Sequence, residues 1–324
     1  MKLELLEIES AVGGVLIHNI ADAQGHKAFA KGHRLGASDI EKLRALGKPQ
    51  VFVGMYEAGD VGENDAATRI AKTLVGENIS QSAVNGGRIN LFAETRGILK
   101  VDLDAMARLN SLEGIAVATI AANQVVEPKK MVATLKVIGL AIAKDVLREV
   151  ENLNRQTSSV IAVRELRATR VALILTGSQA ARARVEKGLI APIHGRVQDL
   201  GGSVVSNEYV EPDAHAIADA IERAKKLNVD CIMLAGETSI MNTSDVTPSG
   251  ITLAGGTIEL YGAPVEPGNL LLLAYANDLP IIGAPGCVKS RDTNVVDLIL
   301  PRVLAGERLR KRDIVALANG GLLI

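Results

Sequence analysis

The stretch Val171-Ala-Leu-Ile-Leu-Thr-Gly-Ser178 begins with five aliphatic residues and ends in a turn. A short aliphatic run of this kind is typical of a strand that is buried on both faces, as in a parallel sheet covered by helices. Two later runs, Asp230 to Ala235 and Pro280 to Gly283, have the same form and also end in glycine-containing turns. The C-terminal half therefore predicts an α/β domain, with a mostly parallel sheet between two layers of helices.

The segments between these runs supply the remaining elements. Ser203 to Val210 is predicted to form a further strand, and Glu211-Pro-Asp213 opens a helix whose apolar residues recur at helical spacing. We expect the other strands over residues 256–260 and 269–275. The other helices are expected over residues 179–200, with a break near 188–192, after residue 245, and over residues 292–304.

The N-terminal half is more mixed. It offers short strand candidates at Val15–Ile20, Val51–Met55 and Ile115–Ile120. Helices are expected over residues 37–46 and 63–75, and a helical pattern over residues 146–156 leads out of this half. We expect the boundary near residue 165. This gives a mixed α+β domain of unknown role over residues 1–165 and the α/β domain over residues 166–324.

The composition restricts the classes of function. Among 324 residues, 48% are hydrophobic and only 2% are aromatic, so the core must be aliphatic. The formal net charge of −1 offers no general basic surface for nucleic acid. No apolar run approaches the length of about 18 residues that a membrane helix needs. The two cysteines do not form a CxxC pair, and the start of the chain does not resemble a signal peptide, so we expect a cytoplasmic protein.

Three loops follow the predicted buried strands, and we expect them to meet, since ligands bind beyond the carboxyl ends of the strands in such sheets. Glycine lets the backbone approach a ligand, while free N–H groups and hydroxyls favour anions. A plain tight turn is the alternative interpretation of each loop taken alone. The candidate ligand-binding residues are Thr176, Gly177, Ser178, Gly236, Glu237, Thr238, Ser239, Gly283, Pro285, Gly286 and Cys287.

Three of the candidate residues admit two interpretations each. Asp213 and Asp245 precede predicted helices, where a carboxylate caps free N–H groups, but two carboxylates at this edge are also able to hold Mg²⁺ between phosphates. Cys287 lies at a predicted helix entry, which would lower its thiol pKa, and the alternative is a buried, inert thiol.

The motifs around these loops resemble those of molybdopterin adenylyltransferase. The resemblance lies in Val210-Glu-Pro-Asp213, in Cys231-Ile-Met-Leu-Ala-Gly-Glu-Thr-Ser239 and in Ser244-Asp-Val-Thr-Pro248. The turns at Thr176–Ser178 and Gly283–Gly286 look more like the related domain of molybdopterin molybdotransferase. The whole C-terminal half, about 155 residues, is most similar to bacterial molybdopterin-binding proteins of this superfamily.

The resemblance implies a small anionic ligand, molybdopterin or its nucleotide form, bound for molybdenum cofactor synthesis or delivery, and a homo-oligomer, either a dimer or a trimer. One alternative is an active transferase, in which Asp213 and Asp245 would be the catalytic, Mg²⁺-binding residues. A second alternative is a nucleotide hydrolase that uses the same domain. The chain departs from the family where Gly236-Glu-Thr-Ser239 replaces a Gly-Gly-Thr-Gly loop, and where Asn85 replaces an acidic residue. The departure at Glu237 favours binding over catalysis.

Overall fold

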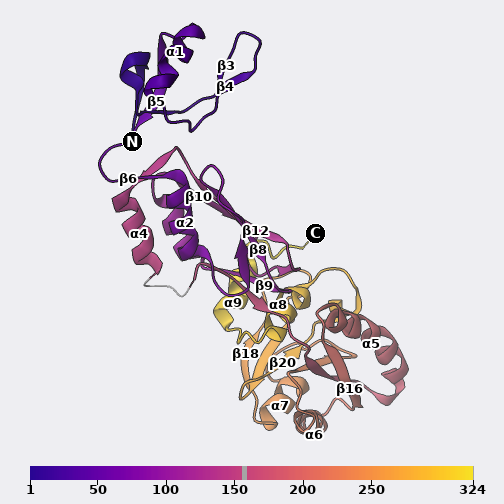
Figure 1. Ribbon diagram of the computed structural model, residues 1–324. Coiled ribbons are helices and arrows are strands. Elements are labelled where there is room, and N and C mark those ends of the chain that lie inside the picture. Colours follow the sequence, from indigo (N-terminus) through magenta and orange to yellow (C-terminus); the bar gives the residue numbers. More distant parts are fainter. Residues whose placement is uncertain (155–158, 324) are drawn as a thin grey trace. The chain divides into compact units, whose positions relative to one another are not determined.

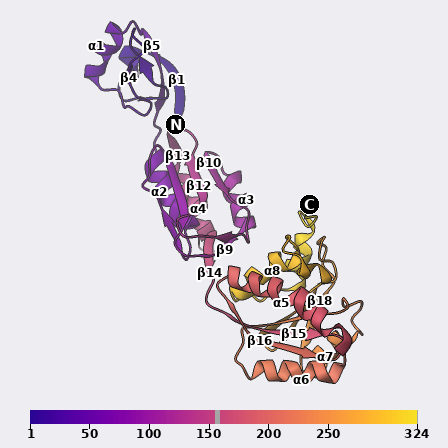
Figure 2. The ribbon, with the colours of Figure 1, turned by 90° about the vertical axis from the view of Figure 1, so that its right-hand side faces the viewer.

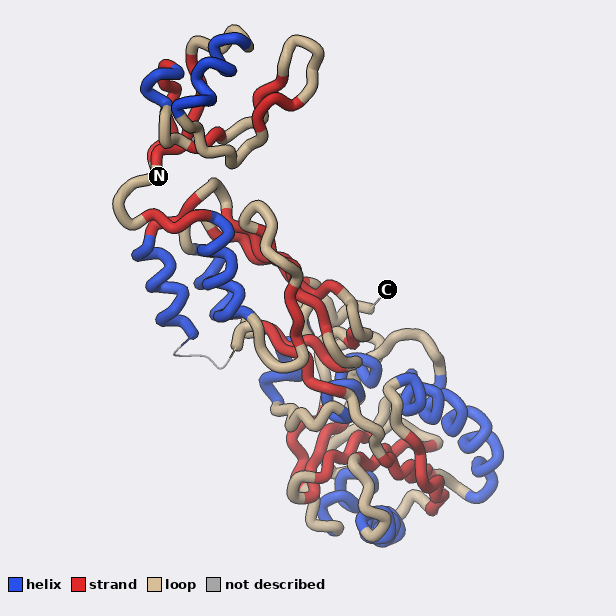
Figure 3. The backbone as a smooth tube through the Cα atoms, in the orientation of Figure 1, coloured by secondary structure: helices blue, strands red, loops and turns tan. Residues whose placement is uncertain are grey.

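The computed structural model describes residues 1–154 and 159–323, which form two compact units, Met1–Arg164 and Glu165–Ile324 (Figure 1). The second unit combines a sheet with helices (Figure 3), and strands and helices alternate along the chain over residues 170–261. Within the described residues, no helix is both long enough and apolar enough to cross a membrane.

In the described part of the second unit, six strands form one sheet in the order β16-β15-β17-β20-β19-β18. The first four strands run parallel, whereas β19 is antiparallel to both of its neighbours. The chain is therefore mixed α/β with a mainly parallel six-stranded sheet, as predicted. The strands are β15 (Arg170–Thr176), β16 (Ser203–Val210), β17 (Cys231–Gly236), β18 (Thr257–Tyr261), β19 (Leu272–Ala276) and β20 (Leu279–Gly283).

Helices cover both faces of this sheet (Figure 2). Because successive residues of a strand point to opposite sides, Leu173 packs in a core with α5 and α8, whereas Ile174 packs in a second core with α6 and α7. Both residues are at most 1% exposed. The helices of the second unit are α5 (Arg182–Asp199), α6 (Ala214–Lys225), α7 (Val246–Leu253), α8 (Val295–Leu304) and the short α9 (Lys311–Val315).

Two predicted helix boundaries are wrong. The expected break near residues 188–192 does not occur, because α5 continues through Pro192. Leu189 and Ile193 are buried against the sheet on either side of this proline, so packing outweighs the lost hydrogen bond. The last long helix begins at Val295 and not near residue 292, since the Asn294 side chain caps it by accepting from Val296 N.

The first unit contains several small antiparallel sheets and two separate hydrophobic cores. The helix predicted over residues 146–156 corresponds to α4. Residues 155 and 156 of this prediction lie outside the described part of the chain. The helices are α1 (Ala37–Ala45), α2 (Glu63–Leu74), α3 (Leu103–Ser111) and α4 (Lys144–Asn154). The longer strands are β1 (Lys2–Glu7), β5 (Gln50–Met55), β8 (Arg88–Ala93), β9 (Gly97–Val101), β10 (Ile115–Thr119), β12 (Met131–Val137) and β14 (Ile161–Glu165). The shorter strands are β2 (Val15–Leu16), β3 (Ile20–Ala21), β4 (Lys27–Phe29), β6 (Asp60–Gly62), β7 (Ile79–Gln81), β11 (Val125–Val126) and β13 (Ala141–Ala143).

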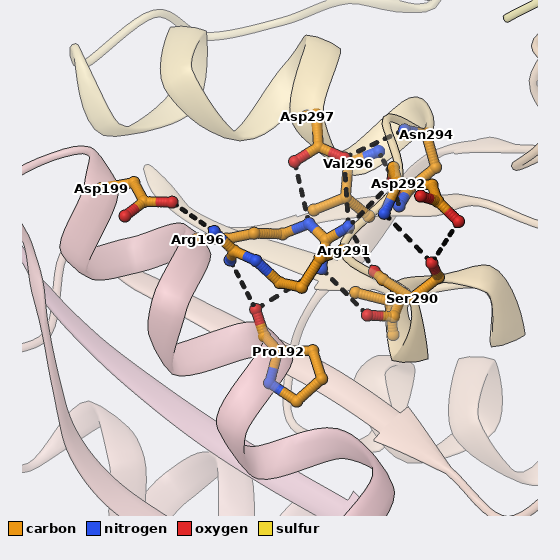
Figure 4. Close-up of polar contacts among 10 residues, drawn as sticks. Pro192, Arg196, Asp199, Ser290, Arg291, Asp292, Asn294, Val296 and Asp297 are labelled. Carbon is orange, nitrogen blue, oxygen red and sulfur yellow. Dashed lines mark hydrogen bonds and ion pairs between the residues drawn. The ribbon is translucent and has the colours of Figure 1, made fainter.

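A buried arginine ties α5 to the segment that follows β20 (Figure 4). The Arg196 side chain is 3% exposed and pairs with Asp297 of α8, with 2.8 Å between Nε and Oδ1. Its terminal nitrogens donate to the carbonyls of Val288, at 3.0 Å, and Ser290, at 2.7 Å. These bonds fix the chain between β20 and α8, which includes a 3-10 turn over Gly286–Lys289 (η3).

Replacing Arg196 is expected to destabilise the protein strongly. Arg196→Met leaves Asp297 Oδ1 and the bonded carbonyls without this donor, while Asp297 Oδ2 still accepts from Asn294 N. We therefore expect the free energy of unfolding to fall by about 3 kcal/mol. Urea denaturation measures this loss. Arg291→Met is the matched control, because Arg291 pairs with Asp199 on the surface, and it should cost less than about 1 kcal/mol. Equal losses in the two variants would contradict the role given to Arg196.

Candidate functional site

The register of the sheet brings the ends of its parallel strands to one edge. Thr176, the last residue of β15, pairs with Val210 of β16 on one side and with Gly236 of β17 on the other. Leu234 of β17 pairs with Gly283 of β20. The loops after β15, β17 and β20 therefore start side by side, as expected for parallel strands.

Close contacts at glycines show how tightly these loops meet. A Cβ atom on Gly177 would overlap the Tyr209 hydroxyl and would lie 3.0 Å from Cβ of Glu237. A Cβ atom on Gly236 would overlap the Thr176 hydroxyl. At the end of β20, where the third loop begins, a Cβ atom on Gly283 would lie 2.7 Å from Cδ1 of Ile240. Larger side chains at these positions would push the loops apart.

A pocket of about 70 Å³ opens between the first two loops and the start of α7. Four hydroxyl side chains and two carboxylates supply its polar lining, and none of its lining residues is basic. Its volume admits a few water molecules, so a larger ligand would lie mostly outside it. The lining residues are Thr176, Gly177, Pro212, Glu237, Thr238, Ser239, Ile240, Asp245, Val246 and Thr247.

The Glu237 carboxylate is bound by the loop after β15. Its Oε2 atom accepts from the Ser178 backbone N–H at 3.0 Å and from the Ser178 hydroxyl at 2.9 Å. Its Oε1 atom accepts from Arg184 of α5 at 2.9 Å. The pKa of the Glu237 carboxyl lies below its ordinary value. The hydrogen bond from the Ser178 backbone N–H lowers this pKa the most, and the bond from the Ser178 hydroxyl and the charge of Arg184 lower it further. The donors at Ser178 therefore already hold one anionic group.

Asp213 and Asp245 both cap helices, as the first of their two interpretations requires. Asp213 accepts from the backbone N–H groups of His215 and Ala216 at the start of α6. Asp245 accepts from Val246 N at 2.7 Å through Oδ1, and from Met241 N at 3.1 Å through Oδ2. Of the two aspartates, only Asp245 lines the pocket; next to Asp213, the loop before α6 contributes Pro212 to the lining.

The contacts of the two aspartates do not support the predicted Mg²⁺ pair, which stays a prediction. Both oxygens of Asp245 are engaged by backbone donors, and no contact joins Asp245 to Asp213 in the part of the chain that the structure describes. Within residues 1–154 and 159–323, no group of three or more His, Cys, Asp or Glu residues is placed to hold a metal.

The third loop adjoins the pocket without lining it in the described structure. Gly286 lies against Ser239, since a Cβ atom on this glycine would be 3.3 Å from the serine hydroxyl. Pro285 precedes the η3 turn that contains Cys287. Burial raises the pKa of the Cys287 thiol, so the expected lowering at a helix entry is wrong, because a single 3-10 turn begins there. The inert-thiol interpretation agrees with this direction.

Two residues near the site were not predicted from the sequence. Arg184 lies at the start of α5, and nothing in its local pattern identifies Glu237 as its partner, 53 positions away. Tyr209 donates from its hydroxyl to the Ser178 carbonyl at 2.8 Å, and the Arg182 guanidinium lies 5.3 Å from its ring centre. Tyr209 lies next to the last residue of β16, and this position near the end of a predicted strand is the sequence signal that could have identified Tyr209 as a site residue.

A domain of unknown function (DUF8806) matches residues 5–55, and no curated protein matches the chain. A molybdenum cofactor biosynthesis protein from Pyrococcus furiosus aligns with 94% of this chain at 12% identity and a TM-score of 0.27. This chain spans 64% of the length of that protein.

Two shorter solved structures align with part of the chain. A putative molybdenum cofactor biosynthesis protein from Corynebacterium diphtheriae covers 43% of this chain and 98% of its own length, at 15% identity and a TM-score of 0.33. CinA, a protein of unknown function from Thermoplasma acidophilum, covers 42% and 98% respectively, at 14% identity and a TM-score of 0.36. Scores at this level do not establish a shared fold.

The hydrogen bonds of Glu237 predict a pH-dependent contribution to stability. Because the folded-state pKa is lowered from the ordinary value of 4.5, this contribution is present above pH 4.5 and is lost as the pH falls through the folded-state pKa. Urea midpoints of the wild type and of Glu237→Gln should therefore differ at pH 7 and converge as the pH falls below the folded-state pKa. A difference that stays constant over this range would contradict the charged hydrogen bonds of Glu237.

Proposed function

We propose that the second unit binds molybdopterin or its nucleotide form, and that the protein acts in the synthesis or delivery of the molybdenum cofactor. One observation carries the proposal. Two of the loops that resemble those of the molybdopterin-binding superfamily, after β15 and β17, line one pocket at the carboxyl edge of the sheet, together with Asp245 of the Asp-Val-Thr-Pro motif. Ligands bind at this edge in sheets of this type.

The chemistry of the lining supports a ligand rich in polar groups. Thr176, Thr238, Ser239 and Thr247 provide hydroxyls that both donate and accept hydrogen bonds. Asp245 provides acceptors for the ring N–H and amino groups of a pterin. The small pocket volume suits one end of such a ligand, with the remainder extending over the loops.

Glu237 supports binding over adenylyl transfer. Catalysis of phosphoryl or adenylyl transfer needs donors that are free to stabilise the negative charge that develops on the phosphate oxygens. At Ser178 these donors already bind the Glu237 carboxylate, so they could stabilise that charge only after this carboxylate is displaced. A binding protein does not need this stabilisation. Pyrophosphate release from ATP on addition of molybdopterin would favour the transferase alternative.

The cytoplasmic location rests on the cysteine pattern, and the oligomeric state rests on the resemblance alone. We propose a cytoplasmic homo-oligomer, a dimer or a trimer. Sedimentation of the purified protein measures this state directly.

Pterin content tests the proposed function. The protein is purified from cells that make molybdopterin, then oxidised, and the fluorescent pterin is measured by chromatography. We expect pterin in the wild type. Thr238→Leu removes a hydroxyl from the pocket and should lower the pterin content by about tenfold, the effect of about one lost hydrogen bond.

Thr243→Leu is the matched control, because Thr243 is exposed on the same loop and does not line the pocket. It should leave the pterin content unchanged. Wild-type protein that carries no pterin, and takes up none on mixing, would overturn the proposed function.

A further inference from the structure

Glu237 occupies a set of donors that suits a phosphate group. Three donors converge on its carboxylate, namely the Ser178 N–H, the Ser178 hydroxyl and the Arg184 guanidinium, all within 3.0 Å. A backbone amide, a hydroxyl and an arginine are also the groups that proteins use to bind phosphate oxygens. The carboxylate supplies two oxygens where a phosphate would supply three.

The Ser178 backbone is held in place independently of the Glu237 side chain. The Ser178 peptide is fixed by the Tyr209 hydroxyl, which donates to the Ser178 carbonyl at 2.8 Å. The Gly177 N–H bonds to Val210 O, and Glu237 N bonds to Thr176 O at 2.8 Å. Loss of the carboxylate therefore leaves the Ser178 donors in position.

The carboxylate itself is able to leave without a change of the backbone. The Glu237 side chain is 28% exposed and has three rotatable bonds, so it reaches solvent by rotation alone. The Arg184 side chain is 67% exposed, so it is also able to change rotamer and pair with an incoming anion. A carboxylate and a phosphate cannot share these donors, because the two negative charges repel each other.

We infer that Ser178 and Arg184 form a phosphate subsite in which the Glu237 carboxylate is a resident competitor that a phosphate-bearing ligand displaces. This inference rests on the proposed function only for the identity of the ligand. Glu237 thereby sets the affinity and the specificity of the site. A ligand whose phosphate is its sole contact binds weakly, whereas a ligand that also fills the adjoining pocket compensates for the displacement of Glu237.

Binding of inorganic pyrophosphate to the full chain, measured by calorimetry at pH 7 and low ionic strength, tests this inference. Glu237→Ala removes the competitor and should bind pyrophosphate at least about tenfold more tightly than the wild type. Adding Arg184→Gln to this variant should abolish the gain, because the guanidinium partner is lost. The urea midpoint of each variant at pH 7 shows that it is folded.

Glu186→Ala is the matched control. Glu186 belongs to the same helix as Arg184 and pairs with Arg182, so this variant removes one charge near the site without freeing the Ser178 donors. It should leave the affinity within about twofold of the wild type. Either of two results would overturn the inference: no gain in Glu237→Ala, or an equal gain in Glu186→Ala.

The pyrophosphate measurement tests the phosphate subsite, and the pterin measurement tests the proposed function, so the two outcomes are distinguishable. If the protein carries pterin but Glu237→Ala binds pyrophosphate no more tightly, the subsite is wrong and the proposed function stands. If Glu237→Ala gains affinity but no pterin is bound, the subsite stands and the proposed ligand is wrong.

Discussion

The pairing of β15 with β16 on one side and β17 on the other is the constraint on which the site depends. Because β15 is buried on both faces, a shift of its register by one residue would exchange Leu173 and Ile174 between two different cores. The register is therefore fixed by packing over the whole strand. That register places Thr176 beside both Val210 and Gly236, and so determines which loops meet.

At the edge formed in this way, the protein satisfies its own donors with its own carboxylates. Asp213 caps α6, Asp245 caps α7, and Glu237 binds the loop after β15. Each carboxylate stabilises local structure, and two of them also line the pocket. An anionic ligand thus meets a site whose positive potential is already partly neutralised, and its binding depends on displacement of one of these groups.

The sequence predicted those parts of the structure that rest on local patterns. Aliphatic runs that end in glycine identified β15, β17 and β20, since buried parallel strands need apolar residues on both faces. The pairing of Glu237 with Ser178 and Arg184 was not predicted, because it joins residues more than 50 positions apart. The continuous α5 was missed for a related reason, since burial of Leu189 and Ile193 overrides the local effect of Pro192.

We propose that the ligand binds where β15 and β17 end. Amide hydrogen exchange with and without molybdopterin tests this location, because it reports on each segment of the chain. Slower exchange should appear in residues 176–182 and 236–247 on addition of molybdopterin, with no change in residues 1–55. Protection confined to the first unit, or absent from residues 176–182 and 236–247, would contradict the claim.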